Sequence, residues 1–138
     1  MKTFTDADKD AISKEVKDQF TQLISALNQS NLGVWSEFYS QDHFLSAIVS
    51  TDYYATKSAW VDTIANYFSM RESQQVEPFE VQVTALAPEL VLLTSQEKIE
   101  MQLKDGKIFK YKHVFTLIWK KEQDGWKILH SHESWIEE

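Results

Sequence analysis

Two Asp-Gly pairs, Asp105-Gly106 and Asp124-Gly125, divide the second half of the chain into long segments in which apolar and polar residues alternate. Asp-Gly between two alternating segments is among the strongest short-range signals for a β-hairpin. A further alternating segment, VEPFEVQVTALAP, comes before them, with a proline near each end, where a strand tolerates proline best. The pattern predicts four long strands, joined antiparallel, from residue 76 onward.

The first part of the chain has the three- and four-residue spacing of helices. Apolar residues recur in this way over residues 6–28, behind a predicted N-cap at Thr5. Asn31 is positioned to cap a short second helix, and Thr56 to cap a third. One or two short strands are expected between the second and third helices, and a polar loop, SMRESQ, after the third.

Helices early and strands late predict an α+β fold, with three N-terminal helices packed on one face of a strongly curved, mainly antiparallel sheet. Strands of roughly 14 residues exceed the common length and must twist and coil. Such a sheet, covered by helices, forms a cone around a concave cavity. Neither a linker nor a repeat interrupts residues 1–138, so a single domain is predicted.

Composition excludes several classes of function. The chain has no cysteine, which rules out disulfides, thiolate metal sites and cysteine nucleophiles, and fits a cytoplasmic location. A net charge of −7 disfavours nucleic acid as a partner. No apolar run approaches a membrane span, and the three glycines form no phosphate-binding loop. We therefore expect no membrane partner, no cofactor and no resident metal.

The order of elements, the DGW turn and the closing WKILHSHES resemble the nuclear transport factor 2-like superfamily, whose fold is also called cystatin-like. Within it, the small bacterial SnoaL-like and ketosteroid-isomerase-like proteins are the most similar, over about residues 8 to 136. This fold hosts isomerases, cyclases, dehydratases and plain binding or assembly domains. The resemblance therefore implies a fold rather than one reaction.

Ketosteroid isomerases use a tyrosine on the first helix, a base aspartate on the first strand and a protonated aspartate in the sheet. The corresponding positions here are Leu23, Ala47 and about His113. Leu23 and Ala47 cannot perform that chemistry. In SnoaL-type cyclases an acid–base residue faces the cavity from the sheet, and a histidine would have to take that role here.

The last strand, GWKILHSHESW, carries two histidines two residues apart. Successive side chains of a strand point to opposite faces, so His130, His132 and Ser134 share a face with Trp126 and Ile128. A two-residue Asp124-Gly125 turn would place His130 opposite Trp119, His132 opposite Leu117 and Ser134 opposite Phe115. With His113 on the same face, this aromatic surface is predicted to face the cavity.

Imidazoles in a partly dry cavity can act as general acids or bases, hold a ligand, or only shape the wall. The acid–base candidates are His132, His130 and His113. The predicted ligand-binding residues are Trp35, Tyr39, Tyr54, Trp60, Glu97, Phe115, Leu117, Trp119 and Ser134. Whether Glu97 faces inward depends on the register, since a one-residue slip reverses a strand. A His-x-His metal site would need His113 or Glu97 as well, and His43 is more typical of a turn.

The opposite face of the sheet, with Val114, Thr116, Ile118, Leu129, Ser131 and Trp135, is predicted to form a homodimer interface. The leading functional hypothesis is a protein that binds a small, largely apolar organic molecule in the cone cavity. A cofactor-independent isomerase, cyclase or dehydratase is the first alternative. A dimerising assembly domain without catalysis is the second.

Overall fold

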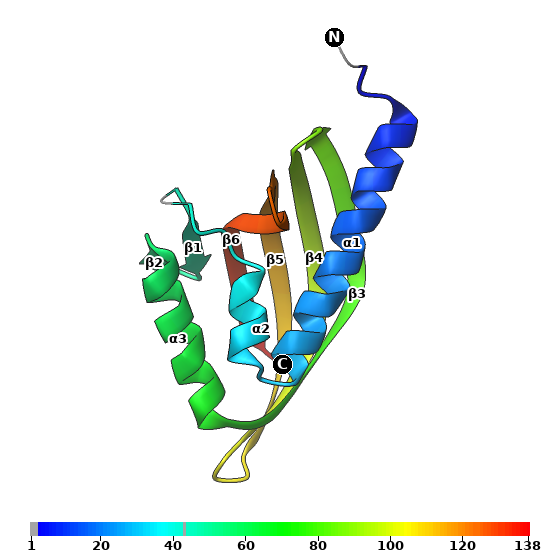
Figure 1. Cartoon of the computed structure of the whole chain (residues 1–138). Helices are drawn as coiled ribbons and strands as arrows, with labels where there is room; N and C mark the ends of the chain where they lie inside the picture. Colours follow the sequence, from blue (N-terminus) through cyan, green and yellow to red (C-terminus); the bar gives the residue numbers. More distant parts are fainter. Residues whose placement is uncertain (1–2, 43) are drawn as a thin grey trace.

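The computed structural model describes residues 3–42 and 44–138, so the predicted turn role of His43 lies outside the described residues. Three helices, α1 (Asp6–Asn28), α2 (Leu32–Glu37) and α3 (Lys57–Met70), cover one side of a single sheet (Figure 1). Thr5 and Asp8 exchange hydrogen bonds in a capping box at the start of α1. Side-chain oxygens of Asn31 and Thr56 accept hydrogen bonds at the starts of α2 and α3, which confirms the three predicted caps.

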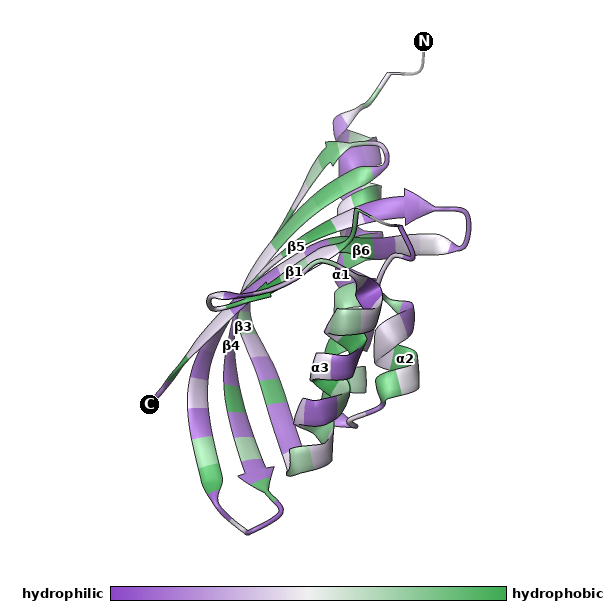
Figure 2. Cartoon of the chain, turned by 90° about the vertical axis from the view of Figure 1, so that its left-hand side faces the viewer, coloured by the Kyte–Doolittle hydropathy of each residue, from purple (hydrophilic) through white to green (hydrophobic). Residues whose placement is uncertain are grey.

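The sheet has six strands in the order β2-β1-β6-β5-β4-β3. Their bounds are β1 (Ser46–Val49), β2 (Asp52–Tyr54), β3 (Arg71–Ala87), β4 (Leu90–Leu103), β5 (Ile108–Glu122) and β6 (Gly125–Glu137). All neighbours are antiparallel except β1 and β6, which run parallel. Seen from the side in Figure 2, the sheet bends around the helices. The predicted α+β fold with a strongly curved sheet is confirmed.

The first residue of β3 follows α3 directly, and the predicted polar loop does not form. Met70 is the last residue of α3 and Arg71 the first of β3. The end of α1 holds the new strand in place: the Asn28 side chain exchanges two hydrogen bonds with the backbone of Val76. The side-chain amide of Gln74 donates to the carbonyl oxygen of Leu27 at 2.9 Å. A stretch that looks polar in sequence therefore enters the concave face of the sheet.

The hairpin between β5 and β6 departs from the predicted register. Its turn residues are Gln123 and Asp124, because Glu122 pairs with Gly125. A second shift follows, since Trp119 pairs with Ile128 whereas Ile118 pairs with His130. One residue of β6 is therefore extra at this point, as in a β-bulge.

The bulge reverses the faces of the second half of β6. Trp126 and Ile128 are buried on the concave side, as predicted. Beyond the bulge, Ser131 and Glu133 are the buried residues, and His132 is exposed. The prediction that all even-numbered residues of this strand face the cavity is therefore wrong after residue 128.

A group of aromatic rings joins α2 to α3. Trp35 contacts Tyr39, Trp60 and Phe68 with ring centroids 4.6, 5.8 and 6.4 Å apart. Leu117 and Trp119 lie beneath the helices with no exposed surface. This core fills one part of the cone and leaves the region near the end of α3 for the cavity described below.

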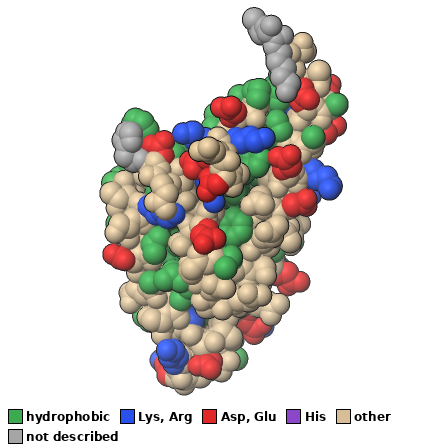
Figure 3. Space-filling model, in the orientation of Figure 1, with side chains coloured by type: hydrophobic (Ala, Val, Ile, Leu, Met, Phe, Trp, Pro, Cys, Tyr) green, Lys and Arg blue, Asp and Glu red, His purple; other side chains and the backbone are tan. Residues whose placement is uncertain are grey.

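The outer surface of the helical side mixes charge and apolar groups. Figure 3 shows acidic and basic side chains scattered over it, with hydrophobic side chains between them.

Within the described ranges, no helix is both long and apolar enough to cross a membrane.

Gly125 tests the account of the β5–β6 turn. Its φ of +121° strains any residue with a Cβ, although the space around it is open. Gly125→Ala should lower the free energy of unfolding by about 1 kcal/mol in urea titrations. Gly33→Ala is the matched control: it lies within α2, its nearest neighbour is 3.8 Å from the added Cβ, and it should be neutral or stabilising. Equal effects of the two substitutions would contradict this assignment.

Candidate functional site

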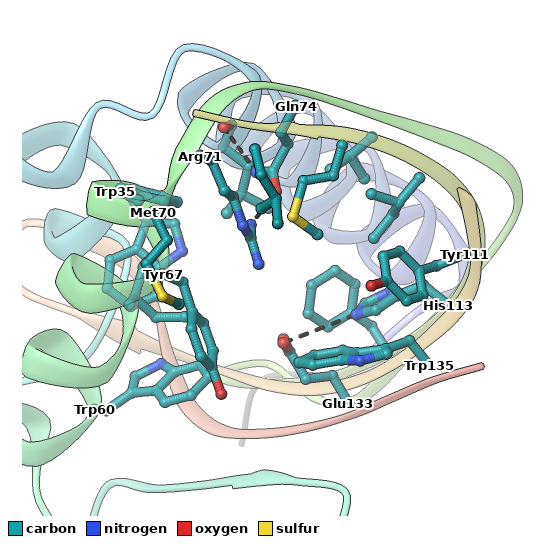
Figure 4. Close-up of a pocket in the computed structure, with 18 residues that line it drawn as sticks. Trp35, Trp60, Tyr67, Met70, Arg71, Gln74, Tyr111, His113, Glu133 and Trp135 are labelled. Carbon is teal, nitrogen blue, oxygen red and sulfur yellow. Dashed lines mark hydrogen bonds and ion pairs between the residues drawn. The ribbon is translucent and has the colours of Figure 1, made fainter. Parts of the chain in front are cut away.

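A cavity of about 260 Å³ lies between the concave face of the sheet and the end of α3 (Figure 4). Side chains from the three helices and from β3, β4, β5 and β6 line it, because the curvature of the sheet brings the inward-facing residues of these strands close together. The apolar and aromatic lining consists of Leu27, Trp35, Trp60, Ile64, Tyr67, Phe68, Met70, Val76, Ile99, Met101, Leu103, Tyr111, Phe115 and Trp135. The remaining lining side chains are Arg71, Gln74, His113 and Glu133. The arrangement is an apolar cavity with a few convergent polar groups.

A histidine between two carboxylates forms the polar wall. Glu97 and His113 are direct partners across β4 and β5, and the Nδ1 atom of His113 lies 2.8 Å from Oε1 of Glu97. On the other side, Nε2 of His113 lies 3.8 Å from Oε1 of Glu133, an ion pair too long for a direct hydrogen bond. Glu97 is fully buried behind His113, which shows that it faces inward, whereas Glu133 borders the cavity.

Burial alone would lower the pKa of His113, but the two carboxylates outweigh it and raise the pKa to about 9. His113 therefore carries a proton at neutral pH. Its ring is fixed by packing as well, since Trp135 stacks beside it with centroids 6.0 Å apart and Phe115 meets it edge-on at 4.3 Å. The charge at this wall is thus held in one position.

Arg71 enters the cavity from the junction of α3 and β3 (Figure 4). Its Nη1 atom donates a hydrogen bond to Oε1 of Gln74, and its guanidinium lies 5.4 Å from the centre of the Tyr67 ring. The pKa of Arg71 is lowered by burial, and the charge of Glu133 offsets this only in part. Within the described chain, no carboxylate comes within ion-pair distance of this guanidinium. The cavity therefore holds a guanidinium with free donors.

The edge of the cavity is formed by half-exposed apolar residues. Met70 is 50% exposed and Trp135 is 39% exposed, and the Tyr67 and Trp135 rings meet edge-on at 6.3 Å. Both Met70 and Trp135 line the cavity as well. A small molecule could enter between the end of α3 and the end of β6.

Residues 16–137 match the family described as the SnoaL-like domain. The chain belongs to the SnoaL-like domain family. No protein with a curated function matches it significantly. The match to the SnoaL-like family confirms the resemblance to the nuclear transport factor 2-like superfamily that was predicted from the sequence.

Solved structures share the fold of this SnoaL-like domain at low sequence identity. A candidate dehydratase of the NTF2-like family from Streptomyces avermitilis has a TM-score of 0.83 and 17% identity, over 93% of this chain and 98% of that one. Hexachlorocyclohexane dehydrochlorinase LinA-type3 from Novosphingobium barchaimii has a TM-score of 0.81 and 12% identity, over 97% and 93%. An uncharacterised protein with a cystatin-like fold from Caulobacter vibrioides has a TM-score of 0.75 and 14% identity, over 89% and 88%. These similarities show the fold alone.

Three residues predicted for the site lie on the outer face of the SnoaL-like sheet. His130 pairs with Ile118, and its Nδ1 atom is 2.9 Å from the hydroxyl oxygen of Ser46 on β1. His132 is exposed, and Ser134 pairs with Val114 on the same outer face. The predicted inward orientation of these three residues is wrong, because the bulge near Leu129 shifts the pairing by one residue.

Ser131 and Trp135, which the sequence placed on the outer face, lie on the concave side for the same reason. His113 is the one predicted acid–base residue that lines the cavity. Glu133 was missed. A prediction that allowed for a β-bulge in the last strand would have placed Glu133, instead of His132, on the cavity side.

The predicted ligand-binding residues divide into two groups. Trp35, Trp60 and Phe115 line the cavity, whereas Glu97 contacts it only through His113. Tyr39, Tyr54, Leu117 and Trp119 do not line it. Leu117 and Trp119 are fully buried in the core, and the Tyr54 ring packs on Trp60 with centroids 5.5 Å apart. Tyr39 is buried beside Trp35, and burial raises the pKa of its hydroxyl.

Arg71 and Gln74 were missed because they lie in SMRESQ, the segment that looked like a polar loop. Among the described residues, no group of three or more His, Asp or Glu side chains is arranged to hold a metal ion.

The raised pKa of His113 predicts a pH dependence of stability. Its folded value of about 9 exceeds the unfolded value of 6.5, so the stabilisation is complete below pH 6.5 and is lost as the pH rises through 9. The free energy of unfolding should fall by about 3 kcal/mol over this window, measured by urea titration at fixed ionic strength. In His113→Gln the profile should flatten over the same window, and the protein should be less stable below it. A flat profile for the unsubstituted protein would contradict the assignment.

Proposed function

We propose that this SnoaL-like domain binds a small, largely apolar organic molecule in the cavity. The supporting observation is the cavity itself: most of its lining is apolar or aromatic, and its few polar side chains gather on the walls formed by β3, β5 and β6. Binding sites for small molecules commonly combine these features. The buried rings of Trp35 and Trp60 form one end of this space and are fixed against each other.

The size of the cavity limits the ligand. About 260 Å³ is just below the range of roughly 300–1,000 Å³ that is typical for drug-sized ligands. A compound with one or two rings is therefore favoured over a steroid-sized molecule. The ring system would contact Trp60, Ile99 and Met101, and its polar end would lie near His113 and Glu133.

Filling the cavity tests the binding proposal. Ile99 lines the cavity from β4, whereas its neighbour Lys98 is exposed on the opposite face. Toluene should bind the unsubstituted protein and shift amide resonances of cavity residues in NMR spectra. Ile99→Trp should weaken this binding at least tenfold because the added ring occupies the site, and Lys98→Trp should leave it unchanged. Absence of toluene binding, or equal binding by the two variants, would refute the proposal.

Proton-transfer catalysis is the second candidate, and the pairing of His113 with Glu133 at the cavity wall favours it. Because His113 is protonated at neutral pH, the side chain able to accept a proton from a ligand is Glu133. His113 would hold that carboxylate in place, and Glu133, once protonated, would return the proton to the product. Isomerisation and dehydration can both begin with removal of a proton from carbon next to a carbonyl group, and Arg71 would stabilise the oxygen anion that forms.

Deuterium exchange separates this candidate from simple binding. The ketone 2-tetralone has exchangeable protons next to its carbonyl group and is small enough for the cavity. In D₂O the protein should accelerate the exchange over buffer, and Glu133→Gln should reduce the acceleration by about 100-fold. Glu100→Gln removes the same charge from an exposed position of β4 and should have no effect. Exchange no faster than in buffer would eliminate the catalytic candidate and leave the binding proposal intact.

Two further features belong to the proposal. We place the protein in the cytoplasm, because the chain has no cysteine. We also retain a homodimer through the outer sheet face, now with His130, His132 and Ser134 on it in place of Ser131 and Trp135. Val114 is 43% exposed at the centre of that face, which is the kind of apolar surface that a second copy would cover.

A further inference from the structure

We propose that the ligand has an uncharged polar end with two functions: an acceptor for Arg71 and a donor for Glu133. This inference rests on the proposed binding function and names the chemistry that the site selects. It favours carboxamides and hydroxy-carbonyl compounds attached to a small ring system, and it disfavours carboxylates, although an arginine in the cavity would suggest an anion.

The charge balance of the site is the first argument. The basic and acidic side chains that line the cavity are Arg71, His113 and Glu133, with Glu97 directly behind His113. With His113 protonated, two positive and two negative charges lie close together and their sum is zero. A carboxylate ligand would add an uncompensated negative charge beside Glu133 in a mostly apolar space, where like charges repel strongly. An uncharged ligand keeps the balance.

The unused hydrogen-bonding capacity of Arg71 is the second argument. A guanidinium has five N–H donors. Within the described residues, the one side-chain acceptor that the Arg71 guanidinium contacts is the amide oxygen of Gln74. Gln74 is itself fixed by its bond to the Leu27 carbonyl, so Arg71 is held toward the cavity (Figure 4). The half-buried guanidinium therefore keeps donors that face the cavity, and a ligand oxygen at this point would accept a charge-assisted hydrogen bond from them.

Glu133 supplies the opposite requirement. It is only 8% exposed, and within the described residues its carboxylate has an ion pair with His113 at 3.8 Å but no direct hydrogen bond. A carboxylate accepts several hydrogen bonds and donates none when ionised. In Figure 4 the Glu133 carboxylate and the Arg71 guanidinium project into the same space from opposite sides. A ligand that joins them needs an N–H or O–H group close to a carbonyl oxygen.

Three probes of equal size distinguish the alternatives. Benzamide offers a donor and a neutral acceptor, acetophenone offers the acceptor alone, and benzoate offers a charged acceptor; all have the same number of non-hydrogen atoms. Affinities are measured by protein NMR titration at about pH 6, where His113 is protonated. Benzamide should bind about tenfold more tightly than either of the other two, the value of one hydrogen bond to a charged group.

Matched variants test each partner. Glu133→Gln gives the site a net positive charge, so benzoate should become the preferred probe. Arg71→Met removes the donors, and benzamide should lose its advantage over toluene. Glu100→Gln, on the exposed face of β4, should retain the order of the unsubstituted protein. Toluene binding and thermal stability show that each variant keeps its cavity.

The relative affinities of the three probes decide between the alternatives. Tighter binding of benzamide, with reversal toward benzoate in Glu133→Gln, supports it. Benzoate preferred by the unsubstituted protein, or equal affinities for the three probes while toluene binds, overturns this inference and leaves the binding function standing. If neither toluene nor any of the three probes binds, both proposals fail.

Discussion

The buried pair of Glu97 and His113 is the interaction on which the rest of the site depends. Glu97 has no exposed surface, and one of its carboxylate oxygens has no hydrogen-bond partner among the described groups. A charge in that position is tolerated only beside an opposite charge, and removal of one partner of a buried pair costs about 3–5 kcal/mol. The Glu97 carboxylate therefore favours the proton on His113, and the ring that carries it lies between Glu97 and Glu133.

The bulge in β6 decides which side chains meet that ring. The extra residue near Leu129 lets Trp126 and Ile128 pack in the core while Glu133 and Trp135 face the cavity farther along the same strand. Without it, His132 would occupy the inner face and Glu133 the outer face. The site would then have two neighbouring imidazoles and no carboxylate at the cavity surface. One inserted residue thus determines the chemistry of the wall.

Much of the fold follows from local rules that need no knowledge of distant contacts. The caps at Thr5, Asn31 and Thr56 and the alternation in β4 and β5 depend on nearby residues, and they were predicted correctly. The bulge is a feature of how β6 pairs with β5, and the direct entry of Arg71 into β3 is accompanied by anchoring at the end of α1. Local alternation does not reveal these features, so His113, Trp35, Trp60 and Phe115 were found, whereas Arg71, Glu133 and Trp135 were missed.

The central claim is that His113 is an imidazolium held between two carboxylates, and the ¹⁵N chemical shifts of its ring nitrogens test it most directly. In neutral solution both nitrogens should have the shifts of protonated sites, and they should keep them until the pH approaches 9. His130, whose pKa is lowered by burial and by His132, serves as the internal reference and should show a neutral ring. A neutral ring at His113, with one unprotonated nitrogen at pH 7, would contradict the account.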